Sequence, residues 1–392
     1  MELNDHNNSV LSSVRYYLKY GYIREFRAWK WIVEYYLVVA ILAVLFLSLL
    51  IYSFQVFPPK NTTIAAGQLG SSTQKMATSF QKYFAEQGLV LNVVSGEGQG
   101  EGLTKLVTES SPVNVGFYIA GHIKPEDYPN LVSLGSVHTA PLWLFYRGAP
   151  IKTDNLFQSF RGKKIAIGLP GTAANSMFRR LSEGQGSDGI NGVILQELPY
   201  DVAEKRLKSG EIDAMFMVYS YDTQIVQGLI KNPDVHILSF PLADAYTKKF
   251  PNLEKVTIPR GAFDIENVLP REDVTMLSTT VNLLSDKNLH HSIQWALLMG
   301  ARQYNRHEKH FFSRPGEFPK DLDYDAIPLS PVAERYYSGG IPQVFSSLPL
   351  WLASLVDQVW IRALAFFIFI YPLAIKLFNL RSFSSQKIKN DS

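Results

Sequence analysis

The sharpest contrast between apolar and polar positions lies at the two ends of the chain. Residues 35–57, YYLVVAILAVLFLSLLIYSFQVF, carry no charged side chain, and about 20 apolar residues in a helix cross a hydrocarbon layer of roughly 30 Å. A second apolar segment at 363–380 is interrupted by Pro372 and Lys376, although a lysine near a helix end can extend to the interface. We therefore expect a transmembrane helix at each end. The alternative is that 348–380 forms one long core helix.

Basic side chains flank both apolar segments on the sides that face the chain ends. Residues 1–34 combine tyrosine and tryptophan with several cations, and residues 381–392 are also basic. The positive-inside rule then places both termini in the cytoplasm and the middle of the chain outside the inner membrane. Residues 348–362, LPLWLASLVDQVWIR, are amphipathic and predict a helix at the lipid interface. The cations are Arg15, Lys19, Arg24, Arg27, Lys30, Arg381, Lys387 and Lys389.

Strand-like and helix-like patterns alternate through the middle of the chain in two matching copies. The motif IAAGQLGSS at 64–72 recurs as IAIGLPGTA at 165–173, which marks an internal repeat. Strands that alternate with helices imply parallel sheets, so we expect two βαβαβ units, hence two lobes with a cleft between them. The expected elements are helix 72–88, strand 89–96, helix 100–110 and strand 113–119 in the first copy, and helix 173–184, strand 193–199, helix 201–211 and strand 212–219 in the second.

Each copy opens on a glycine turn between a strand and a helix. The carboxyl ends of parallel strands form the ligand-binding edge of an α/β sheet, and the first N–H groups of a helix are unpaired and electropositive. The turns lack the lysine and the third glycine of nucleotide-binding loops, so the predicted occupant is a small organic anion. The alternative is a tight turn whose hydroxyls only cap the helix. The predicted ligand-binding residues are Gly67, Gly70, Ser71, Ser72, Ser95, Gly98, Tyr118, Gly171, Thr172, Ala173 and Tyr219.

Composition excludes several classes of protein. The 392 residues allow two or three domains, and a net charge of +3 gives no support for nucleic-acid binding. Because the chain has no cysteine, disulfides, thiolate metal sites and cysteine nucleophiles are excluded. His307, Glu308 and His310 do not have the spacing of a zinc-protease helix. We expect no enzyme activity, cofactor or metal.

Five motifs in this order resemble the TAXI-type solute receptors of tripartite ATP-independent periplasmic (TRAP) transporters. They are IAAGQLGSSTQKMATSF, LNVVSGEGQGEGLTKL, VGFYIA, RGKKIAIGLPGTAANSM and RLKSGEIDAMFMV, and the likeness covers roughly residues 60–340. The resemblance implies an α/β, two-lobed type II periplasmic-binding fold that closes on a small carboxylate. Lobe one would combine 60–145 with 241–345, lobe two would be 146–240, and strands at 141–147 and 235–243 would cross between them.

The function expected from these features is that of a membrane-anchored extracytoplasmic receptor for a small organic anion. By the resemblance its partners would be TRAP-type permease subunits, and its anchors would contact membrane lipid. Two alternatives stay open. One is a tethered sensor or scaffold of the same fold without a transport role. The other is an extracytoplasmic enzyme, which is disfavoured because no set of nucleophile, base and orienting group stands out.

Overall fold

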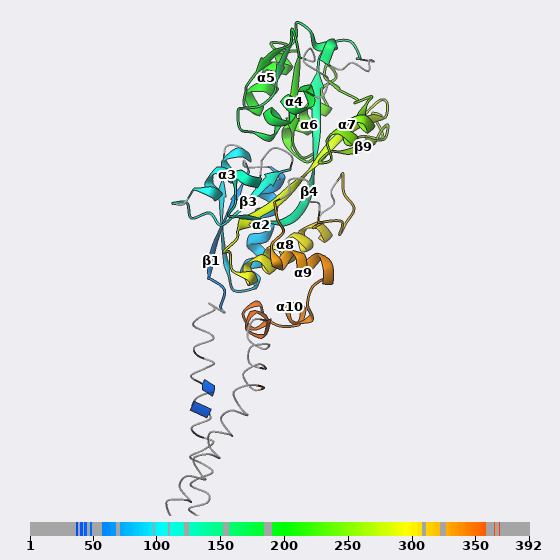
Figure 1. Cartoon of the computed structure of the whole chain (residues 1–392). Helices are drawn as coiled ribbons and strands as arrows, with labels where there is room; N and C mark the ends of the chain where they lie inside the picture. Colours follow the sequence, from blue (N-terminus) through cyan, green and yellow to red (C-terminus); the bar gives the residue numbers. More distant parts are fainter. Residues whose placement is uncertain are drawn as a thin grey trace, which may run out of the picture. The chain divides into compact units, whose positions relative to one another are not determined.

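The computed structural model describes residues 57–67, 71–96, 99–108, 110–120, 125–151, 157–183, 190–307, 311–321 and 327–357 (Figure 1). It also places a few isolated residues of the terminal apolar segments in helices, namely Leu37, Ala40, Ile41, Ala43, Val44, Ser48, Leu364 and Ile368. The chain divides into two compact units, residues 58–350 and the two ends 1–57 with 351–392. Among the residues described, no helix has the length and apolarity needed to span a membrane. Most of 35–57 and 363–380 lie outside them.

A ten-stranded mixed sheet runs through the unit of residues 58–350, in the order β2-β1-β3-β10-β4-β7-β5-β6, with β8 on β4 and β9 on β10. At one end of this order, β1 pairs in parallel with both β2 and β3. The first predicted βαβαβ unit is therefore confirmed. Its elements are β1 (Asn61–Ala66), α2 (Ser72–Glu86), β2 (Val90–Ser95), α3 (Gln99–Val107) and β3 (Val115–Ile119).

The second copy of the repeat forms the other end of the sheet. There β5 pairs in parallel with β6 and β7, as predicted. Helix α5 ends at Gly210, whose φ of 81° gives the left-handed C-cap that favours glycine. The elements are β5 (Lys164–Ala166), α4 (Ala173–Glu183), β6 (Ile194–Gln196), α5 (Tyr200–Ser209) and β7 (Ala214–Val218).

Two long antiparallel strands, β4 (Leu131–Tyr146) and β10 (Val274–Asp286), cross between the two lobes. Strand β4 pairs with β10 from Leu131 to Leu142 and then with β7 as far as Tyr146. Strand β10 pairs with β9 (Glu254–Ile258) at its start and with β3 at its end. Each strand thus belongs to both lobes, and the predicted two-lobed α/β architecture is confirmed.

The structure corrects the expectation that residues 235–243 form the second crossover. Only β8 (His236–Ile237) is a strand there, and it pairs with β4 inside the second lobe. Pro241 has no N–H to donate to a ladder, and α7 (Ala243–Lys249) begins two residues later. Helix α7 and β9 lie beside α4 to α6 (Figure 1), so they belong to the second lobe and the second crossing is β10.

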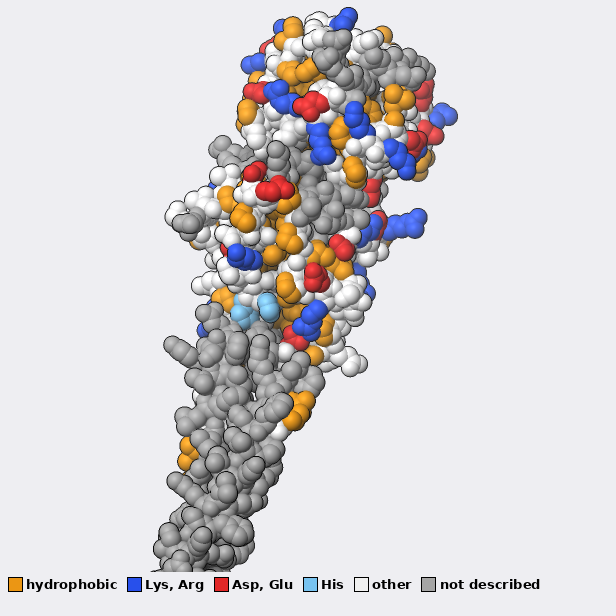
Figure 2. Space-filling model, in the orientation of Figure 1, with side chains coloured by type: hydrophobic (Ala, Val, Ile, Leu, Met, Phe, Trp, Pro, Cys, Tyr) orange, Lys and Arg blue, Asp and Glu red, His pale blue; other side chains and the backbone are white. Residues whose placement is uncertain are grey.

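Helices cover the sheet and bury its apolar residues. In the first lobe α2 packs against α8 (His291–His307), and the rings of Phe80 and Phe84 are fully buried. A Cβ at Gly300 would come within 3.2 Å of the Phe80 ring, so glycine there lets the two helices approach closely. Figure 2 shows positive and negative side chains interspersed over the lobe that carries α4 to α7. The described residues also form the α-helices α6 (Gln224–Ile230), α9 (Pro331–Gly339) and α10 (Gln343–Ser347).

Candidate functional site

The first glycine turn, which links β1 to α2, is filled by its own hydroxyls. Ser71 is the N-cap of α2, and its Oγ accepts a hydrogen bond from the N–H of Gln74 at 3.2 Å. The Oγ1 of Thr73 accepts from the N–H of Gly67 at 3.2 Å, and the two hydroxyls are 3.1 Å apart. A Cβ at Gly67 would lie 2.6 Å from Thr73 Oγ1. Glycine is therefore required because the hydroxyls occupy the turn.

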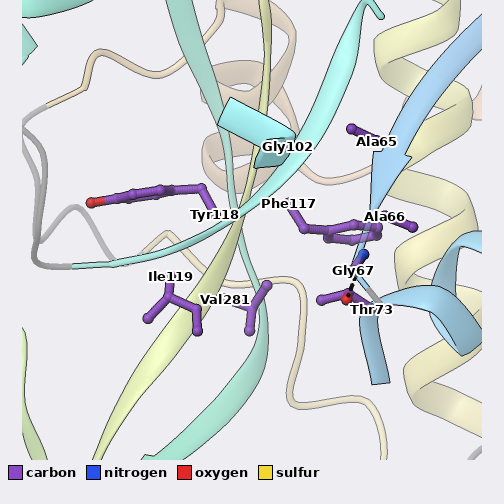
Figure 3. A pocket seen from close by; sticks show the side chains of 9 residues that line it. All are labelled: Ala65, Ala66, Gly67, Thr73, Gly102, Phe117, Tyr118, Ile119 and Val281. Atoms are coloured by element: carbon purple, nitrogen blue, oxygen red, sulfur yellow. Dashed lines mark hydrogen bonds between the residues drawn. The ribbon is translucent and has the colours of Figure 1, made fainter. Parts of the chain in front are cut away.

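A small pocket opens beside this turn, between β1, β3 and α3 (Figure 3). Its volume of about 10 Å³ has room for about one water molecule. In this conformation it is too small for an organic ligand. Its lining residues are Ala65, Ala66, Gly67, Thr73, Gly102, Phe117, Tyr118, Ile119 and Val281.

The second glycine turn, between β5 and α4, leaves more space. Gly168 and Gly171 adopt φ values of +83° and +78°, a left-handed conformation that side-chain-bearing residues rarely take. Thr172 Oγ1 donates to the carbonyl of Leu169 at 2.7 Å and accepts from the N–H of Asn175 at 3.4 Å. A Cβ at Gly171 would meet no atom within 4 Å. The space in front of this turn is therefore open.

The other predicted ligand contacts differ in their surroundings. Ser72 and Ala173 are buried in the first turns of their helices, and Ser95, the last residue of β2, is exposed. Tyr118 is buried against Leu103 and Leu106, and in Figure 3 its ring points away from Gly67. Gly70 and Gly98 lie outside the described residues, as do Glu308 and His310 of the histidine-rich segment.

Tyr219 follows β7 and belongs to the hydrophobic core of the second lobe. Its ring is only 9% exposed and packs edge-on against Tyr200 at 5.4 Å. Burial raises the pKa of Tyr219 above its usual value, and the nearby charge of Asp222 raises it further. The phenol is therefore neutral at physiological pH, and its ring packs as a core side chain.

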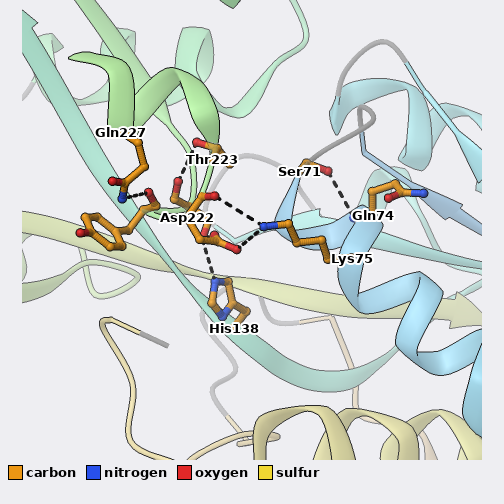
Figure 4. A network of polar contacts seen from close by, with 9 residues as sticks. Ser71, Gln74, Lys75, His138, Asp222, Thr223 and Gln227 are labelled. Atoms are coloured by element: carbon orange, nitrogen blue, oxygen red, sulfur yellow. Dashed lines mark hydrogen bonds and ion pairs between the residues drawn. The ribbon is translucent and has the colours of Figure 1, made fainter. Parts of the chain in front are cut away.

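An ion pair that joins the two lobes was not predicted from the sequence. Lys75 Nζ on α2 lies 2.9 Å from Asp222 Oδ2, which follows β7 in the second lobe (Figure 4). Ser220 Oγ donates to Asp222 Oδ1 at 2.5 Å and lies 3.3 Å from His138 Nε2 on β4. Because the single hydroxyl proton of Ser220 goes to Asp222, the His138 Nε2 must be the donor to Ser220. One connected polar network thus reaches from α2 through the second lobe to the crossing strand β4.

Hydrogen bonding keeps the carboxyl group of Asp222 ionised. Burial alone would raise the pKa of Asp222, but hydrogen bonds from Lys75 and Ser220 lower it below its usual value of 3.8. Asp213, a second aspartate of the same repeat, instead pairs with Lys163 at 3.1 Å and accepts from the N–H of Lys164. The position of Asp222 just after a parallel strand is the one sequence feature that could have singled it out.

Comparisons with known proteins assign the chain to a family. The sequence profile of the NMT1-like family matches residues 120–339, more than half of the chain. No curated protein matches it. Solved structures with a similar fold include a protein from Bordetella bronchiseptica RB50, at 12% identity and a TM-score of 0.46 over 71% of this chain and 96% of that one.

Two further similar structures are those of solute-binding proteins. The alkanesulfonate-binding protein SsuA from Xanthomonas axonopodis pv. citri, bound to MOPS, is 13% identical, with a TM-score of 0.41 over 63% of this chain and 74% of that one. The amino acid ABC transporter substrate-binding protein AbpA from Streptococcus pneumoniae, bound to L-arginine, is also 13% identical, with a TM-score of 0.38 over 62% and 89%. At this level of identity and structural similarity, the ligands of those proteins are not assigned to this chain.

Proposed function

We propose that this chain, which belongs to the NMT1-like family, is a solute-binding receptor that takes a small organic anion between its two lobes. The observation that carries the proposal is the pair of matching strand-to-helix turns, one at the carboxyl end of β1 and one at that of β5. These turns lie in two different lobes, and among the described residues two long strands, β4 and β10, connect the lobes. Two such edges facing one cleft are the arrangement that α/β folds use for ligands.

An anion is the class of ligand that the second turn favours. Each helix N-terminus contributes about 0.3–1 kcal/mol toward a negative charge, and each charge-assisted hydrogen bond about 1.5–3 kcal/mol. The open space at Gly171 gives an anion access to the N-terminus of α4. In the first lobe Lys75 supplies a cation one turn into α2. A carboxylate is the occupant we favour, delivered to TRAP-type permease subunits.

The ligand class is tested with the full-length chain in detergent, by a thermal-shift screen against carboxylates, sulfonates, amino acids and neutral sugars. We expect a carboxylate to raise the melting temperature. To donate to the anion, the Thr172 hydroxyl must turn its one proton away from the carbonyl of Leu169. Thr172→Val removes this donor and should weaken that ligand by about tenfold or more, the effect of losing a charge-assisted hydrogen bond. Thr172→Ser keeps the hydroxyl and the helix cap, so it is the matched control.

A neutral sugar as the only tight ligand would reject the anion proposal, as would full carboxylate affinity in Thr172→Val. Thr172 is a better position to mutate than Gly171. The φ of Gly171 is +78°, so any side chain there is strained whether or not a ligand binds.

Membrane anchoring through both apolar segments is part of the proposal. Leu37, Ile41 and Val44 are spaced to share one face of a helix, and their side chains are 56%, 50% and 62% exposed. An exposed apolar stripe in an uncharged segment fits a lipid environment. Both termini would then lie in the cytoplasm, with the two-lobed domain on the periplasmic side of the inner membrane.

Topology can be tested with single cysteines, because the chain has none of its own. We expect a membrane-impermeant thiol reagent to label a cysteine at Lys231 in intact cells, but not one at Ser9 or Ser385. Lysed cells, in which all three positions should react, serve as the control. Labelling at Ser385 without labelling at Ser9 would show that the second apolar segment does not cross.

A tethered sensor or scaffold is the second candidate, and the first turn favours it. The N–H of Gly67 is bonded within the turn, and the contact between Ser71 and Thr73 uses one of their two hydroxyl protons, so at most one hydroxyl proton of this pair is left for a ligand without rearrangement. A screen in which no solute raises the melting temperature would favour this candidate over the receptor.

A further inference from the structure

We propose that residues Ser220–Asp222 are an interlobe clasp that holds the two lobes together in the absence of any ligand. These three consecutive residues follow β7 in the second lobe, and each of them contacts a different part of the first lobe or of the segment after α8. The inference rests on the two-lobed architecture, and its consequence for ligand entry rests on the proposed function.

The polar side of the clasp consists of Ser220 and Asp222. Asp222 accepts from Lys75 Nζ at 2.9 Å, and the same nitrogen lies 3.5 Å from the backbone carbonyl of Asp222. Ser220 contacts His138 on β4, where the side chain of His138 is 5% exposed. The clasp therefore reaches both a helix of the first lobe and the strand about which the lobes would rotate.

The aromatic side of the clasp is Tyr221. Its ring centroid is 4.3 Å from that of Phe311 and 5.1 Å from that of Phe263. Phe311 follows α8, a helix of the first lobe, whereas Phe263 lies between β9 and β10. Phe311 is 38% exposed, so its ring can leave Tyr221 without opening a core, whereas Tyr221 and Phe263 stay packed on the core of the second lobe.

Hydrogen bonds within the second lobe fix the conformation of the clasp. Thr223 Oγ1 donates to the carbonyl of Ser220 at 2.9 Å, and Gln227 Nε2 donates to the carbonyl of Tyr221 at 3.0 Å. Trp143 Nε1 donates to the carbonyl of Tyr219 at 2.8 Å. The segment is thus held in shape by its own lobe, and it links to the other lobe through its side chains and the backbone carbonyl of Asp222.

The clasp is weak enough for a ligand to open. The Lys75 and Asp222 side chains are 47% and 44% exposed. A solvated ion pair of this kind shifts the equilibrium between joined and separated lobes by about fivefold or less. When Lys75 leaves, Asp222 keeps its hydrogen bond from Ser220. An anionic solute that offers Lys75 an equivalent partner could therefore replace Asp222 at little cost.

The test measures the distance between the lobes in the full-length chain with no solute added. Spin labels on cysteines at Lys82 in α2 and Lys205 in α5, both exposed, report this distance by pulsed electron resonance. We expect a single narrow distribution in the parent chain. Asp222→Asn should raise the population of longer distances about threefold to fivefold, and adding Tyr221→Ala should raise it further.

Asp244→Asn is the matched control, because Asp244 pairs with Lys255 at 2.7 Å within the second lobe. It removes the same charge and should leave the distance unchanged. A parent-like distribution in the Asp222→Asn/Tyr221→Ala chain, or an equal shift in Asp244→Asn, would overturn the clasp. Since no solute is present, a chain that opens as expected but binds nothing in the screen would reject the receptor function and keep the clasp.

Discussion

Replacing Gly135 by alanine is expected to lower the free energy of unfolding by about 3–5 kcal/mol, the sum of backbone strain and overpacking. Gly135 lies in β4 with a φ of +92°, where a side chain is strained. A Cβ there would lie 2.1 Å from Tyr337 Oη and 2.7 Å from the carbonyl oxygen of Lys320. The tyrosine cannot simply turn aside, because its hydroxyl donates to the carbonyl of Leu134 at 2.8 Å. Urea unfolding followed by circular dichroism measures the loss.

Gly148 provides the control for backbone strain alone. Its φ is +108°, yet an added Cβ would meet no atom within 4 Å. Gly148→Ala should therefore cost only the strain of the backbone, about 1–3 kcal/mol. If the two alanine variants lose the same stability, the contact with Tyr337 and Lys320 contributes nothing and our account of Gly135 is incorrect.

The two repeats could be predicted because their signals are local. The stretch STQKMATSFQKYFAE follows the Ser71 cap and places Met76, Phe80 and Phe84 on one face, as an amphipathic helix requires. The glycine turns mark where each strand ends and each helix begins. Every element expected in the two repeats is present, and the differences are a few residues at the ends.

The second crossing strand could not be predicted because its partners are far away in the sequence. Strand β10 buries polar side chains, which a pattern-based interpretation assigns to a surface. Thr280 and Asn282 on β10 both bond to Ser136 Oγ on β4, at 3.1 Å and 2.7 Å. These partners are more than 140 residues apart along the chain. Only the folded structure supplies the hydrogen bonds that make such a strand stable in the interior.

The candidate site, too, could be predicted only in part from the sequence. A serine after a glycine turn can either cap a helix or bind an anion, and both roles use the same hydroxyl. The sequence could not decide between them for Ser71, whose hydroxyl caps α2 in the structure. Lys75 and Asp222 lie 147 residues apart, and no local sequence pattern predicts their ion pair.

Trp143→Ala is expected to lower the free energy of unfolding by about 3–5 kcal/mol, as for other large aromatic side chains removed from a core. Trp143 is fully buried on β4 and stacks on Phe145 with ring centroids 5.5 Å apart. It also contacts Phe312, 5.9 Å away in the segment after α8. The variant leaves a cavity next to the clasp and removes the donor to the carbonyl of Tyr219. Besides lower stability, the labels at Lys82 and Lys205 should report longer distances.

Trp143→Phe separates packing from hydrogen bonding at this position. It keeps an aromatic ring against Phe145 but leaves the buried carbonyl of Tyr219 without the indole donor, which should cost about 1–3 kcal/mol. A loss in Trp143→Phe as large as that in Trp143→Ala would mean that the hydrogen bond to Tyr219, and not the ring, is the main contribution. Longer interlobe distances in Trp143→Phe would then be expected as well, because the Tyr219 carbonyl directly precedes the three residues that join the lobes.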